Sequence, residues 1–166
     1  LSSLPRGGQR IAIGAIKAED LIPRTRVAHR DFDTGSGYQR LPAPGRITSI
    51  AKGLTGNKVD LPTAILLNQR NFDEAVNLVT TEGGNALLVL GPDDLLWEVD
   101  GQTRCGGLKE ALDADFERFR DYEIPFVAGL GWTPDFELEA FYVVNSNAKS
   151  VSTTIAYDLL TTMNAS

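Results

Sequence analysis

The chain has 166 residues, enough for one domain with a substantial core, and its 42% hydrophobic and 23% charged residues are ordinary for a globular protein. Its net charge of −6 argues against a general nucleic-acid clamp, which needs a basic surface. No apolar run is long enough to cross a bilayer. One cysteine and one histidine cannot alone form a disulfide or a zinc site, so we expect a reducing, cytoplasmic setting.

The N-terminal half is predicted to contain two strands and one helix. Alternating apolar residues predict a strand that ends at about Lys17. The polar segment 24–44, rich in Gly and Pro, predicts a long loop. Apolar residues of "RITSIAKGL" (46–54) recur every three or four positions, which is typical of one helix face. "LPTAILL" (61–67) is short and apolar, which predicts a buried strand.

Further elements follow in the second half. Strands are predicted around the Gly-Gly pair within residues 74–90 and over "LLWEV", which ends at Asp100. A helix is predicted from residue 103 to 112, and a strand over 122–130 with Pro125 near an edge or at the strand opening.

Two helices complete the predicted order. The first covers 133–145, with Thr133 as its N-cap and Pro134 at its first position. The second is amphipathic and starts near residue 150. This mixed order predicts an α+β domain in which helices pack on a small mixed sheet. The chain begins without Met and without a secretion signal, so we expect a processed chain or a piece of a longer protein.

The junction "VDGQTRCGG" (99–107) places several small and polar residues where a strand passes into a helix. A helix N-terminus offers free amides to an anion, and Gly101 lets a phosphate approach the backbone. Thr103 can donate a hydroxyl hydrogen bond, and Arg104 can hold phosphate oxygens in a bidentate manner. Gln102 can contact a base or a ribose, and Asp100 can cap the helix or hold a metal ion. An ordinary turn explains the same residues, and on chemistry alone it is slightly favoured.

Two other polar clusters are candidate ligand contacts. Asn145, Asn147 and Lys149 lie between the last two predicted helices, where helix caps explain them equally well. Arg40, in "GYQR", precedes a helix and can bind an anion or form a salt bridge. Two other features are better explained without function. "DTGSG" (33–37) spells a protease motif without its second Asp, and His29 has no visible catalytic partner.

These three clusters, in this order, resemble the DGQHR-domain family of the ParB/sulfiredoxin-like superfamily. "VDGQTRCGGL" is similar to the family signature, "YQRLPAPGRITSIAKGL" to its upstream segment and "FYVVNSNAKSVS" to its downstream helices. The resemblance implies one ParB-like α+β domain over residues 1–166. It also implies a link to bacterial DNA-modification and defence systems such as Dnd-type phosphorothioation.

Superfamily relatives bind nucleotides, so the resemblance implies a nucleotide-binding regulatory component that uses ATP or CTP with Mg²⁺. The nucleotide and phosphate contacts it implies are Asp100, Gly101, Gln102, Thr103, Arg104, Arg40, Asn145 and Lys149, with Asp100 also the candidate metal ligand. Thr103 replaces the family's His, so we expect nucleotide binding, with a weak NTPase activity towards ATP or CTP at most. Cys105 falls on the apolar helix face and is predicted to be a buried, inert thiol.

Two alternatives to nucleotide binding stay open. The first is a DNA-binding repressor domain that uses no nucleotide and relies on the early cluster of arginines for phosphate contacts. The second is a structural interaction module, which an internal salt bridge at Asp100 or Arg104 and the lack of an open pocket would favour. We expect an oligomer or a protein partner, and we expect the main DNA contacts to be made through other domains or subunits.

Overall fold

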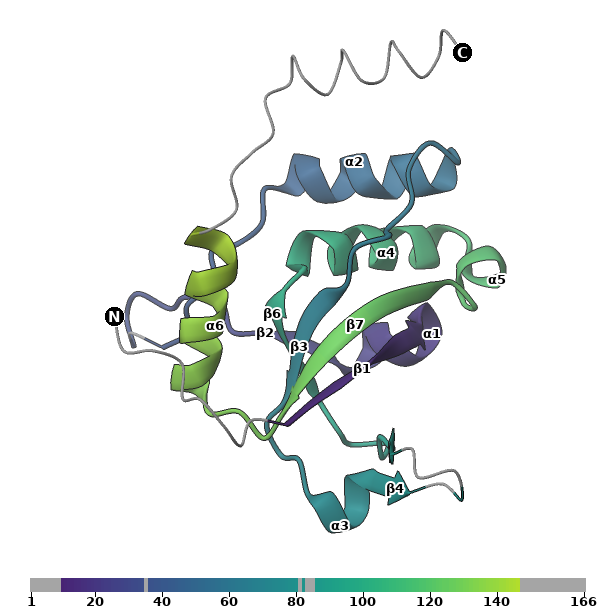
Figure 1. Ribbon diagram of the computed structural model, residues 1–166. Coiled ribbons are helices and arrows are strands. Elements are labelled where there is room, and N and C mark those ends of the chain that lie inside the picture. Colours follow the sequence, from purple (N-terminus) through teal and green to yellow (C-terminus); the bar gives the residue numbers. More distant parts are fainter. Residues whose placement is uncertain (1–9, 35, 81, 83–85, 147–166) are drawn as a thin grey trace, which may run out of the picture.

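The computed structural model describes residues 10–34, 36–80, 82 and 86–146 (Figure 1). The helix predicted near residue 150 lies outside these residues, as do Asn147 and Lys149. In the first half the elements are β1 (Arg10–Lys17), α1 (Ala18–Leu21), the 3₁₀ turn η1 (Ile22–Arg24), β2 (Thr25–Val27), α2 (Pro44–Thr55), β3 (Ile65–Gln69), α3 (Glu74–Asn77) and β4 (Leu78–Thr80). They continue with β5 (Ala86–Leu88), β6 (Leu96–Asp100), α4 (Gln102–Ala114), α5 (Phe116–Phe119), β7 (Glu123–Leu130) and α6 (Pro134–Ser146).

Five strands form a mixed sheet in the order β1-β7-β3-β6-β2. The pairs β1·β7 and β3·β6 are antiparallel, whereas β7·β3 and β6·β2 are parallel. Strands β4 and β5 form a separate antiparallel pair. The predicted α+β class with a small mixed sheet is therefore confirmed.

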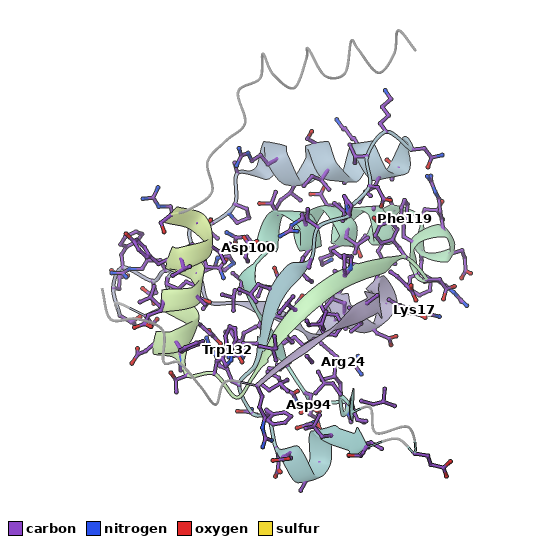
Figure 2. The ribbon with its side chains drawn as sticks, viewed as in Figure 1. Lys17, Arg24, Asp94, Asp100, Phe119 and Trp132 are labelled. Atoms are coloured by element: carbon purple, nitrogen blue, oxygen red, sulfur yellow. The ribbon has the colours of Figure 1, made fainter. Side chains whose placement is uncertain are left out.

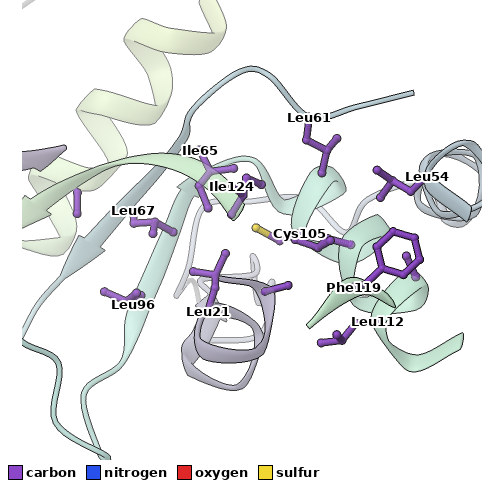
Figure 3. Close-up of a cluster of buried hydrophobic side chains, with 14 residues drawn as sticks. Leu21, Leu54, Leu61, Ile65, Leu67, Leu96, Cys105, Leu112, Phe119 and Ile124 are labelled. Carbon is purple, nitrogen blue, oxygen red and sulfur yellow. The ribbon is translucent and has the colours of Figure 1, made fainter. Parts of the chain in front are cut away.

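The main core lies between the sheet and the helices α1, α2 and α4 (Figure 3). Leu21, Ile65, Leu67, Leu108 and Ile124 are among its fully buried side chains. They come from apolar faces of α1, β3, α4 and β7, and burial of these faces supplies the main favourable free energy of folding. Cys105, which sequence analysis predicted to be buried, is 3% exposed and belongs to this core.

Glycines on α4 allow α2 to pack closely against it. A Cβ on Gly106 would lie 2.9 Å from Cδ1 of Ile47, and one on Gly107 would overlap the side chain of Ile50. The two glycines that follow Cys105 in the sequence therefore serve helix packing, and their role in the junction is not to cradle a ligand.

Helix α6 covers the opposite face of the sheet, where Val99, Trp132 and Ala140 form a second buried cluster. Figure 2 shows Trp132 close to the start of this helix. The predicted N-cap is confirmed, because the amide of Phe136 donates to Oγ1 of Thr133 at 3.3 Å. No described helix has the length and the apolar run that a bilayer crossing requires.

A buried polar cluster attaches α6 to the sheet. Glu137 is 0% exposed, and its carboxylate accepts hydrogen bonds from Nε and Nη2 of Arg70, at 2.8 and 2.6 Å. Nδ2 of Asn68 donates to the same carboxylate at 2.6 Å, and the hydroxyl of Tyr38 does so at 3.3 Å. The Arg70 guanidinium also lies 3.6 Å from the ring centroid of Trp97. We refer to Tyr38, Asn68, Arg70 and Glu137 as the Glu137 cluster.

Three details of the sequence prediction are corrected by the fold. Residues Glu74–Asn77, predicted as part of a strand, form the short helix α3. The segment 24–44 is not all loop, because Thr25–Val27 forms β2 and His29 forms a β-bridge with Gln39. Pro125 does not mark an edge strand, since β7 lies between β1 and β3. Instead it lies at a strand opening: pairing with β3 begins one residue later, at Phe126.

We expect Arg70→Ala to lower the free energy of unfolding by about 3–5 kcal/mol, because it leaves the Glu137 carboxylate buried without its charged partner. Urea denaturation followed by circular dichroism measures this loss. The matched control is Lys109→Ala, which breaks the exposed pair Lys109–Asp113 and should cost at most about 0.5 kcal/mol. Equal losses in the two variants would contradict the role given to the Glu137 cluster.

Candidate functional site

The strand-to-helix junction lies where sequence analysis predicted it. Strand β6 ends at Asp100 and α4 begins at Gln102, with Gly101 between them as the N-cap. The amides of Arg104 and Cys105 both donate to the carbonyl of Gly101, at 2.8 and 2.9 Å. The amides of the first helical residues, Gln102 and Thr103, have no intrahelical acceptor and remain available at the helix N-terminus.

Gly101 is required by the backbone and by packing. Its backbone φ of 116° is an angle that residues with a Cβ rarely adopt. A Cβ would also lie 2.6 Å from Cγ2 of Ile65 and 3.3 Å from Nη2 of Arg104. The predicted close approach of a phosphate is therefore not needed to explain this glycine.

Arg104 is engaged by the protein itself. Its Nη2 donates to Oδ2 of Asp100 at 2.9 Å. Its Nη1 donates to the carbonyl and hydroxyl of Thr63, at 2.8 and 2.6 Å, and to the carbonyl of Ala64 at 3.0 Å. Arg104 thereby fixes the segment before β3 to the start of α4, and its Nη1 is fully used by acceptors within the protein.

A cavity of about 630 Å³ nevertheless opens at this junction, and it brings together parts of the chain that are far apart in sequence. Figure 2 shows Asp100 where β6 passes into α4. Of the candidate residues from sequence analysis, the cavity is lined by Arg40, Asp100, Gly101, Gln102, Thr103, Arg104 and Asn145. Its other lining residues are Tyr38, Gln39, Arg46 and Phe141. We refer to it as the junction pocket.

The positive charge of the junction pocket comes from Arg40 and Arg46. Both side chains are exposed, and neither forms an ion pair with any described residue. By contrast, Asp100 is paired with Arg104, so the one carboxylate that lines the pocket is balanced. The pocket therefore offers two free cations and a helix N-terminus to an anion.

Amide side chains form one wall of the junction pocket. Gln102 donates through Nε2 to the carbonyl of Arg40 at 3.0 Å, which holds the loop before α2 against the start of α4. Gln39 is 1% exposed and donates through Nε2 to the carbonyl of Glu98. The Oε1 atoms of Gln39 and Gln102 accept no hydrogen bond from the described residues.

Tyr38, in the loop before α2, and Phe141, on α6, form an aromatic pair. The rings of Tyr38 and Phe141 lie 5.2 Å apart, centroid to centroid, and both line the junction pocket. Burial and the charge of Glu137 raise the pKa of Tyr38, so its hydroxyl stays protonated and donates to that carboxylate. Tyr38 also lines a second cavity of about 620 Å³, together with His29, Arg70 and Trp97.

A buried carboxylic acid lies behind the junction. Glu98 is 4% exposed, and burial raises its pKa above the ordinary range, an effect that the Thr25 and Cys105 side chains partly offset. Burial also raises the pKa of the Cys105 thiol, and the charge of Glu98 adds to it. Cys105 is thus protonated and enclosed, as sequence analysis predicted.

Other cavities lie in the described part of the chain, among them one of about 190 Å³ lined by His29, Glu98, Cys105 and Lys109. The described residues contain no cluster of three His, Cys, Asp or Glu side chains that could hold a metal ion. A cavity of about 680 Å³ lies at the far end of α2, but there the guanidinium of Arg118 caps that helix by donating to the carbonyls of Leu54 and Thr55.

Sequence analysis did not select four residues that line the pocket. Arg46 was noted only as part of a basic cluster, and Tyr38 and Gln39 adjoin the selected Arg40. Phe141 lies one helical turn before Asn145, and this spacing could have identified it.

Comparisons with known proteins name no family. No family model matches the sequence, and no curated protein matches it. One similar solved structure is the C-terminally truncated chromosome-partitioning protein ParB from Caulobacter crescentus, complexed with CTP-γ-S. The TM-score is 0.48 and the sequence identity 14%, over 93% of this chain and 63% of the ParB chain. The chain thus spans less than two thirds of that protein, and a likeness this loose transfers neither ligand nor activity.

We expect Gly101→Ala to lower the free energy of unfolding by about 1–3 kcal/mol, because alanine is strained at this φ and its Cβ contacts Ile65. Thermal and urea denaturation measure the change. Gly45→Ala is the control, since nothing lies within 4 Å of its added Cβ and it is within α2. This control should be neutral or slightly stabilising.

Glu98 makes stability depend on pH in a defined direction. In the unfolded chain it loses its proton near its ordinary pKa of about 4.3. Because its folded pKa is raised, stability falls as pH rises between these two pKa values and levels off above the folded one. We therefore expect Glu98→Gln to become more stable relative to the wild type as pH rises through that window. Urea denaturation at a series of pH values tests this, with exposed Glu110→Gln as the charge-matched control.

Proposed function

We propose that the junction pocket binds a nucleotide through its phosphate groups. The observation that carries this proposal is the convergence on one cavity of Arg40, the start of α4 and Asn145, three segments that lie far apart in the sequence. The proposal gives a purpose to exposed cations that the described structure leaves without acidic partners.

The phosphates would lie against the N-terminus of α4. The helix dipole and the free amides of Gln102 and Thr103 favour an anion there, and the Thr103 hydroxyl lines the same cavity. Arg40 and Arg46 would supply charge-assisted hydrogen bonds. Arg104 is assigned an indirect part: it neutralises Asp100, which would otherwise repel the phosphates, and it fixes the helix start.

The base and sugar would occupy the side of the pocket formed by α6. Tyr38 and Phe141 present aromatic surface, on which a base can stack. Asn145 lines the same cavity, and its Nδ2 is bonded to the carbonyl of Phe141, which leaves Oδ1 for a donor on the ligand. Lys149 lies outside the described residues and is retained as a candidate contact from sequence analysis alone.

Mg²⁺ is compatible with this arrangement. Magnesium at phosphates commonly uses one or two carboxylates together with phosphate oxygens and water, so the lack of a three-residue cluster in the described structure is no obstacle. Asp100 is the carboxylate at the pocket, with 34% of its side chain exposed, and one of its oxygens bonds Arg104. The proposal covers binding of ATP or CTP and leaves hydrolysis aside, because Thr103 stands where the DGQHR family has His.

The biological setting in this proposal rests on the sequence resemblance. We place the chain as a regulatory component of a bacterial DNA-modification or defence system, in which nucleotide binding reports to DNA-contacting domains or subunits. The pocket geometry supports the ligand class, and the resemblance supports the setting.

We expect Arg40→Ala and Arg46→Ala each to weaken nucleotide binding by about tenfold or more, since a hydrogen bond to a charged group contributes roughly 1.5–3 kcal/mol. Isothermal titration calorimetry with ATP, CTP and GTP, with and without Mg²⁺, measures this. Cytidine and adenosine without phosphates should bind much more weakly than their triphosphates.

Arg26→Ala is the matched control. It is also exposed, but its guanidinium bonds the carbonyls of Pro23 and Thr25 and does not line the junction pocket. No heat with any triphosphate, or equal loss in all three variants, would refute the proposal. A salt-dependent shift of duplex DNA without nucleotide binding would instead support the repressor alternative. Arg104→Ala is a poor test, because loss of its internal hydrogen bonds destabilises the site itself.

A further inference from the structure

Strand β1 is an edge strand that lacks the features which usually prevent pairing with another chain. It is the outermost strand of the five-stranded sheet, and among the described residues no strand pairs with its outer side. Over eight residues, "RIAIGAIK", it contains no proline and no charge between its two end residues, and its pairing with β7 shows no register shift. Prolines, central charges and bulges are the features that protect edge strands from other chains.

The opposite edge of the same sheet is protected in the ordinary way. Strand β2 has only three residues, Thr25–Val27, with Arg24 before it and Arg26 at its centre. Two edges of one sheet therefore differ in length and in charge. This difference is expected if β1, and not β2, receives a further strand.

The side chains of β1 also suit a partner. Ala12 and Ile16 pack against the core, whereas Ile11 and Ile13 project from the other face and are 53% and 75% exposed. The two charged end residues are balanced within the chain: Arg10 pairs with Glu74, and Nζ of Lys17 lies 2.5 Å from Oδ1 of Asp121. The strand therefore presents apolar side chains and unpaired backbone groups without net charge.

We propose that β1 pairs with β1 of a second copy of this chain, antiparallel and about a two-fold axis, to form a continuous ten-stranded sheet. The axis passes at Ile13, so that Ile13 faces Ile13 of the second copy and Ile11 faces Ala15. This register keeps core-facing residues on one face of the joined sheet, because residues on both strands retain their alternation. It also covers the most exposed apolar residue of the strand.

A second copy is favoured over a different protein by symmetry. An antiparallel two-fold pair joins the β1 edges of both copies in one contact. It also ends the assembly at two copies, since the remaining edge of each sheet, β2, is short and charged. Eight-residue strands bury less area than a standard interface, so we expect a dissociation constant in the micromolar range or higher.

Disulfide trapping tests the register with the whole chain. Directly opposed residues of antiparallel strands have Cα atoms about 4.5–5.5 Å apart, within the range of a disulfide. Ile13→Cys should therefore form a covalent dimer under mild oxidation. Ile11→Cys is the matched control on the same face: its copies would be about 13 Å apart at 3.3 Å per residue, and it should stay monomeric on a non-reducing gel. The natural Cys105 is 3% exposed and should not react.

Sedimentation over a range of concentrations tests the dimer itself. The wild type should show a monomer–dimer equilibrium, and Ile13→Lys should weaken it at least tenfold by placing two charges at the axis. Because Ile13 is 75% exposed, this variant should retain the circular dichroism spectrum of the wild type. A wild type that is monomeric at its highest soluble concentration, a dimer that survives Ile13→Lys, or equal cross-linking at Ile11 and Ile13 would each overturn the proposal.

Discussion

The buried carboxylate of Glu137 is the interaction on which the arrangement of the junction pocket depends. It receives hydrogen bonds from β3, through Asn68, from Arg70 just beyond that strand, and from Tyr38 in the long loop. A buried carboxylate without such donors would be very unfavourable, so α6 can lie on this face of the sheet in few other positions. Because α6 carries Phe141 and Asn145, the same constraint sets one wall of the pocket.

The other wall depends on a different kind of constraint. Gly101 adopts a left-handed backbone conformation, and the Arg104 guanidinium joins Asp100 to the segment before β3. These contacts orient the start of α4 without help from a ligand. The pocket is thus preorganised by buried charge on one side and by backbone geometry on the other, which reduces the entropy lost on binding.

Much of the fold follows from local patterns in the sequence. Alternation and helical spacing predicted β1, α2, β6, α4 and α6, because these elements each bury one regular face. The order of strands in the sheet could not be predicted in this way. Pro125 suggested an edge because it lacks an N–H, yet β7 accommodates it at the residue before parallel pairing begins.

The candidate site, like the fold, could be predicted from the sequence only in part. The segment Asp100–Arg104 and the residues Arg40 and Asn145 could be selected from their types and neighbours, and they line one cavity. The actual role of Arg104 could not be predicted, since its partners Thr63 and Ala64 are about forty residues away and two of the three acceptors there are backbone carbonyls. Backbone acceptors leave no trace in side-chain chemistry. The Glu137 cluster was missed for a related reason, because its members come from three segments that are far apart in the sequence.

Tyr38 lines two cavities at once, the junction pocket and the neighbouring cavity lined by His29 and Trp97. Its hydroxyl donates to Glu137, so the carboxylate that attaches α6 to the sheet also holds the residue that the two cavities share. A change in the position of this one side chain would therefore alter the lining of both cavities.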